Sequence, residues 1–72
     1  MNDMVVAAKD VKVGDRVFNP VAVQEKLPER LHWWTVSKVD INEERQRVVV
    51  CTAAFDSHYH PGEAVAIRRA EP

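Results

Sequence analysis

The chain has 72 residues, of which 46% are hydrophobic and 29% are charged, a globular composition that excludes a disordered polar segment. Ten Lys and Arg residues against eleven Asp and Glu residues give a formal net charge of -1, which argues against a dominant nonspecific affinity for nucleic acid. The single cysteine excludes an internal disulfide framework.

A chain of this length is expected to form one domain, residues 1–72, that buries only about 60% of the surface exposed by its unfolded form. Its margin of stability is a few kcal/mol, so dimerisation or a bound partner can contribute to it. The N-terminal residues have no basic region followed by a hydrophobic stretch, and no segment is long and apolar enough to span a membrane. We therefore expect a cytoplasmic protein with no membrane partner.

The first expected elements are a short strand over residues 4–8 and a turn within residues 11–17, Val-Lys-Val-Gly-Asp-Arg-Val. Gly14 can adopt the positive φ of a tight turn, and Asp15 can bond to the nearby backbone. A strand begins at Arg16. Alternation places the three valines on one side, which we expect to face the interior.

A long irregular segment follows this strand. Asn19-Pro20 ends the strand, because proline lacks a backbone donor and restricts the residue before it. Residues 21–30 then contain a second proline and mixed charges, which predicts a loop. Loops of this length in compact domains are often functional.

The next strand, over residues 31–41, requires a bulge. A straight strand places Trp34 and Val36 on one face and Val39 and Ile41 on the other. An extra residue near Ser37-Lys38 would bring all four side chains inward together and leave Trp33 outward.

The second half of the chain predicts further strands. A polar turn over 42–45 precedes a strand over 46–55 that is apolar on both faces and includes Cys51 as a small core residue. A short strand near Tyr59, a Pro61-Gly62 turn and a last strand over 64–69 follow. The expected fold is all-β, a small five-stranded barrel over residues 10–69, because closure limits exposed strand edges.

The order of these segments resembles small Src-homology-3-like barrels over residues 10–69. The segments are Val-Gly-Asp-Arg-Val, a long loop, Trp-Trp-Thr-Val-Ser-Lys-Val, a polar hairpin, Val-Val-Val-Cys-Thr and Pro-Gly-Glu-Ala-Val-Ala-Ile-Arg. The chain is similar in particular to short uncharacterised proteins of actinobacteria and their bacteriophages. The resemblance implies a barrel fold and a binding role, with no reaction.

The aromatic residues carry the main functional hypothesis. Trp33 and Trp34 point to opposite faces of a strand, so at least one of them is expected at the surface, where it could contact a peptide, a base or a methylated cation. The alternative is that one ring is core and the other packs the long loop. The candidate partner-binding residues are Leu27, Pro28, Arg30, Trp33, Trp34 and Tyr59.

A second hypothesis is nucleic-acid binding through arginines. Arg45, Arg47, Arg68 and Arg69 would lie near one another if the strands over 46–55 and 64–69 are neighbours. Nearby glutamates offset these charges, so a solvated surface of mixed charge is the alternative.

Catalytic and metal sites find little support in the sequence. His58 and His60 share one side of a strand and could bind a metal with His32, Asp56 or Glu63. An activated cysteine needs an electropositive, partly exposed setting, which the apolar run around Cys51 does not provide.

We therefore predict a noncatalytic module that binds another protein and uses no metal or cofactor. It fits a phage or bacterial accessory protein that acts on a host factor. Exposed edge strands would also permit a homo-oligomer.

Overall fold

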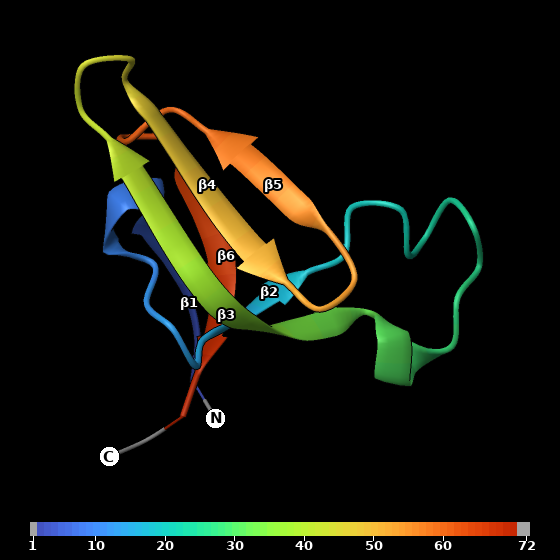
Figure 1. The fold of residues 1–72 in the computed structure, drawn as a ribbon. Coiled ribbons are helices and arrows are strands. Elements are labelled where there is room, and N and C mark those ends of the chain that lie inside the picture. Colours follow the sequence, from blue (N-terminus) through green and yellow to red (C-terminus); the bar gives the residue numbers. More distant parts are fainter. Residues whose placement is uncertain (1, 71–72) are drawn as a thin grey trace.

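The computed structural model describes residues 2–70 as one antiparallel sheet of six strands with no α-helix (Figure 1). The strands are β1 (Asn2–Ala7), β2 (Arg16–Phe18), β3 (Trp33–Asn42), β4 (Arg47–Thr52), β5 (Asp56–Tyr59) and β6 (Ala64–Arg69). Two 3-10 turns, η1 (Ala8–Asp10) and η2 (Glu29–Leu31), precede β2 and β3. The expected all-β class is confirmed, and each expected strand has a counterpart.

The sheet is curved but not closed. Its order is β1-β6-β2-β3-β4-β5, so β1 and β5 are edge strands and are not paired with each other. The long strand β3 pairs with β2 along its first part and with β4 along its second, which bends the sheet into two halves (Figure 1). A closed five-stranded barrel is therefore not confirmed.

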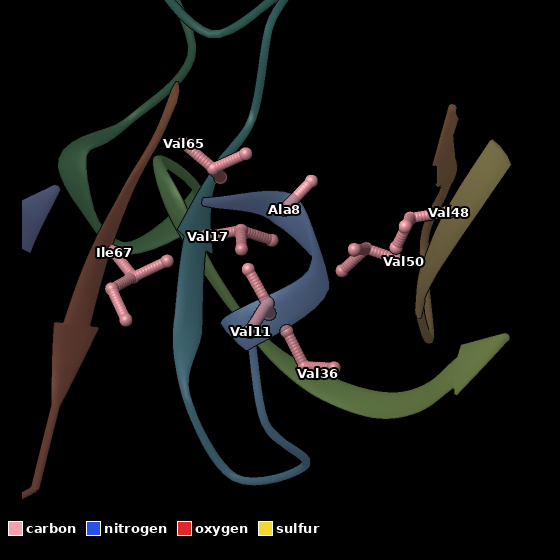
Figure 2. Packing of buried hydrophobic residues seen from close by; sticks show 8 residues of the cluster. All are labelled: Ala8, Val11, Val17, Val36, Val48, Val50, Val65 and Ile67. Carbon is pink, nitrogen blue, oxygen red and sulfur yellow. The ribbon is translucent and has the colours of Figure 1, made fainter. Parts of the chain in front are cut away.

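The core lies between the two halves of the sheet. Val65 and Ile67 on β6 and Val48 and Val50 on β4 are buried and point toward one another (Figure 2). The alternation of the last expected strand is thus confirmed. Most of these core side chains are valines, whose branched shape suits a pleated surface.

The bulge expected in β3 is present. Val36 is paired with Thr52 and Lys38 with Cys51, so Ser37 is an extra residue in β3. The bulge turns Val36 and Val39 toward the core, as expected. Ile41, in contrast, is 50% exposed, because it lies near the hairpin end of the strand, where the sheet no longer covers it.

Two further expectations about buried residues were wrong. Val13 is 66% exposed, because it lies at the corner of the turn before β2, although Val11 and Val17 are buried as expected. Cys51 is only half-buried, because it projects from the face of β4 opposite to that of Val50.

The turn before β2 has the geometry that its glycine permits. Gly14 adopts a φ of 96°, and the Asp15 N–H donates to the Lys12 carbonyl at 3.0 Å. The Gly14 N–H donates to the Val36 carbonyl, and the Val36 N–H to the Asp15 carbonyl. The turn is thereby joined to β3 on the side where the bulge begins.

Asp15 forms a partly buried ion pair that joins this turn to the last strand. Its side chain is 4% exposed and accepts hydrogen bonds from the Arg69 guanidinium at 2.8 and 2.9 Å. The Lys12 N–H donates to the same carboxylate at 2.9 Å. The bonds from Arg69 and Lys12 outweigh desolvation and lower the pKa of Asp15.

We predict that Gly14→Ala lowers the free energy of unfolding by about 1–2 kcal/mol, because an alanine strains at positive φ. Gly62→Ala is the matched control, since neither glycine has an atom within 4 Å of an added Cβ and only Gly14 has a positive φ. We expect the control to change stability by less than about 0.5 kcal/mol. If urea denaturation shows that Gly14→Ala and Gly62→Ala lower the free energy of unfolding by the same amount, the prediction is wrong.

We also predict that Asp15→Asn lowers the free energy of unfolding at pH 7 by about 2 kcal/mol, because the Arg69 guanidinium loses its charged partner. The pKa of Asp15 is lower in the folded state, so its contribution is present above about pH 4 and is lost as the pH falls through the folded pKa. The stability difference between wild type and variant should therefore narrow on acidification.

Asp3→Asn is the control for this experiment. It removes the carboxylate from an exposed pair with Arg68 and should cost less than about 1 kcal/mol. A stability difference between wild type and Asp15→Asn that stays constant from pH 7 to pH 3 would contradict the assigned role of the carboxylate.

Candidate functional site

The loop between β2 and β3 is closed at its base by Asn19. This residue is 7% exposed, and its N–H donates to the His32 carbonyl at 2.6 Å. Its side chain accepts from the Val21 N–H at 3.2 Å and donates to the Leu31 carbonyl at 3.4 Å. Beyond this base the loop projects away from the sheet (Figure 1).

Trp33 lies on the outer face of the sheet. It is paired with Phe18 on β2, and the two rings meet edge to face with centroids 5.4 Å apart. The Arg68 guanidinium carbon lies 4.1 Å from the centroid of the Trp33 ring, and the Arg68 Nε donates to Asp3 at 3.0 Å. The indole is therefore held by an aromatic ring and by a cation that is itself fixed.

Trp34 lies on the opposite face, as the alternation requires. It is paired with Val17, a core residue, and its indole N–H donates to the Leu31 carbonyl at 2.8 Å. Its ring meets Phe55 edge to face at 6.5 Å. Both tryptophans are half-buried, so neither of the two is the freely exposed one.

The two tryptophans nevertheless contribute to one shallow groove of about 360 Å³. We call it the tryptophan groove, and it is lined by Arg16, Arg30, Leu31, Trp33, Trp34, Thr35 and Ala53. It runs from β2 and the start of β3 to η2 and the turn after β4. Three of the predicted partner-binding residues, Trp33, Trp34 and Arg30, thus come together.

The other three predicted residues do not line the groove. Leu27 and Pro28 belong to the loop, where the Leu27 carbonyl lies 2.9 Å from the His32 ring Nε2. Tyr59 lies on β5, opposite Val48, and packs against the core. Leu27, Pro28 and Tyr59 are therefore not part of the tryptophan groove.

Sequence reasoning missed Arg16, Leu31, Thr35 and Ala53 as lining residues. The position of Arg16 beside the tryptophans depends on the pairing of β2 with β3, which local alternation does not specify. Arg16 and Arg30 are exposed, and within residues 2–70 neither has a carboxylate in ion-pair distance. The groove is consequently aromatic and positively charged.

The four arginines of the nucleic-acid hypothesis are not brought together along the sheet. Strands β4 and β6 are separated by β2 and β3, so the neighbourhood that this hypothesis required is absent. Arg68 and Arg69 are each bound to an aspartate. Arg45 and Arg47 line a hollow of about 970 Å³ with three acidic side chains at the hairpin after β3, a surface of mixed charge.

The histidines and the cysteine form no cluster of metal ligands in the described part of the chain. Among residues 2–70, no three His, Cys, Asp or Glu side chains are placed to hold a metal ion, so His58 and His60 lack the further ligands considered with them. Burial and the neighbouring Asp56 raise the pKa of the Cys51 thiol. At neutral pH this thiol is therefore protonated and weakly nucleophilic.

We predict that Asn19→Ala loosens the base of the loop, because the Val21 N–H and the Leu31 carbonyl lose a partner. If the free energy of local opening falls by about 1.4 kcal/mol, the amide hydrogens of Val21 and Ala22 exchange about tenfold faster. Exchange within β4, measured in the same NMR experiment, is the internal control and should be unaffected. Uniformly faster exchange would indicate global destabilisation instead.

Comparison of the chain with protein-family models, characterised proteins and solved structures finds no match. Within residues 2–70, no helix has the length and apolarity needed to cross a membrane. The functional interpretation therefore depends on the tryptophan groove and the charges around it.

Proposed function

We propose that the chain is a noncatalytic binding module that contacts a segment of another protein through the tryptophan groove. The observation that carries this proposal is the convergence of Trp33 and Trp34, from opposite faces of β3, on one surface hollow. Tryptophan and arginine are the residue types most enriched at the energetic centres of protein interfaces.

The fixed positions of both rings support this proposal. Trp33 is held by Phe18 and Arg68, and Trp34 by its hydrogen bond to the Leu31 carbonyl. Side chains that are already ordered lose little conformational entropy on binding, which favours affinity. The side chains of the groove are thus preorganised for binding.

The chemistry of the lining favours binding over catalysis. None of the seven lining residues is a histidine or a carboxylate that could act as a general base, so the lining offers no group to activate the Thr35 hydroxyl. We extend the proposal to an accessory protein of a bacterium or phage, of the Src-homology-3-like class, that acts on a host factor in the cytoplasm. The curved all-β sheet is consistent with this class.

The test compares proteins captured from the natural host by wild type and by Trp33→Ala. Loss of a central aromatic anchor costs about 2 kcal/mol, so recovery of the partner should fall up to about 30-fold in quantitative mass spectrometry. Val23→Ala is the control, because Val23 is 72% exposed in the loop between β2 and β3 and does not line the groove.

Thermal unfolding of both variants must show that they remain folded. Capture of the same proteins in the same amounts by wild type and Trp33→Ala would overturn the proposal.

A further inference from the structure

The tryptophan groove carries uncompensated positive charge, although the whole chain has a net charge of -1. Among residues 2–70, the only charged residues that line it are Arg16 and Arg30. The nearby Arg68 and Arg69 are bound to Asp3 and Asp15, whereas within residues 2–70 neither lining arginine has such a partner. The positive charge is therefore local to the groove.

Strand register adds an independent observation about Arg16. On one side it lies opposite Thr35, and on the other side it lies directly opposite Arg68. Like charges that are directly opposite in a sheet repel each other and are destabilising. Asp3 is a partner for Arg68 only, so an anion bound at Arg16 would relieve the remaining repulsion.

We infer that the partner segment is an acidic peptide, an inference that rests on the proposed function. Its carboxylates bind the guanidinium groups of Arg16 and Arg30, and an adjacent apolar side chain packs on Trp33 and Trp34. Guanidinium and carboxylate match in geometry and form strong, charge-assisted hydrogen bonds. The complementary charges also accelerate association and make it sensitive to salt.

Single-stranded nucleic acid is also anionic, but the geometry favours a peptide. Binding of such strands depends on bases stacked on open aromatic faces. The guanidinium of Arg68 already lies over Trp33, and Phe55 packs against Trp34. The apolar walls that remain suit an aliphatic or aromatic side chain of a peptide better than a row of stacked bases.

The test selects peptides from a random phage-displayed library on the 72-residue chain and measures their binding by fluorescence anisotropy. We expect the selected peptides to contain Asp or Glu beside an apolar residue and to bind more weakly as salt is raised. The double variant Arg16→Gln/Arg30→Gln should bind them about 30-fold more weakly, because two charge-assisted contacts are lost.

Arg45→Gln/Arg47→Gln is the matched control. It removes the same number of charges of the same residue type from the hairpin after β3, and we expect less than a threefold change in affinity. A peptide whose Asp and Glu are replaced by Asn and Gln should bind weakly to wild type. The affinity of this neutral peptide should fall little further when wild type is replaced by the Arg16→Gln/Arg30→Gln variant, because the peptide carboxylates that the arginines would bind are already absent.

Three results would overturn the inference. They are selected peptides without acidic residues, an equal loss in both double variants, and tighter binding of a single-stranded oligothymidylate than of the peptides. If Trp33→Ala abolishes peptide binding but Arg16→Gln/Arg30→Gln leaves the affinity unchanged, the inference of an acidic peptide is wrong and the proposed function stands. If no peptide is selected, or if Trp33→Ala has no effect on those that are, the proposed function fails as well.

Discussion

The ion pair between Asp15 and Arg69 is the constraint on which the arrangement of the sheet depends. It joins a turn near the start of the chain to the end of β6, the strand that lies between β1 and β2. A carboxylate that is 4% exposed needs compensation for its lost hydration, and both Arg69 and the Lys12 N–H provide it. Because this geometry is satisfied only when β6 lies beside β2, the pair favours one topology over other pairings of similar valine-rich strands.

The bulge in β3 is the second feature that determines how the sheet bends. It adds Ser37 to β3 at the point where this strand passes from β2 to β4. Bulges increase local twist and bend a strand, which here allows the two halves of one sheet to pack against each other over a shared core. A short chain can therefore bury a core of valines without a second sheet or a helix.

Local patterns in the sequence predicted the elements well, because they depend on alternation and turn chemistry. The turn at Gly14, the strand end after Phe18 and the bulge near Ser37 each follow from neighbouring residues. Strand order, the open edges and the Asp15–Arg69 pair depend on contacts between distant segments, which periodicity does not encode. For the same reason the tryptophans were identified as candidates, but Arg16 was not recognised as part of the groove.

Asn19 separates two parts of the loop that differ in how freely they can evolve. Leu31, which lines the groove, is bonded to Asn19, and Arg30 directly precedes it, whereas residues 23–28 make no bond to Asn19. Changes in the length or sequence of the tip can therefore accumulate without displacing the groove. Natural variants could acquire a second, independently adjustable contact surface on the same scaffold, and an engineered epitope or fluorophore could be carried there.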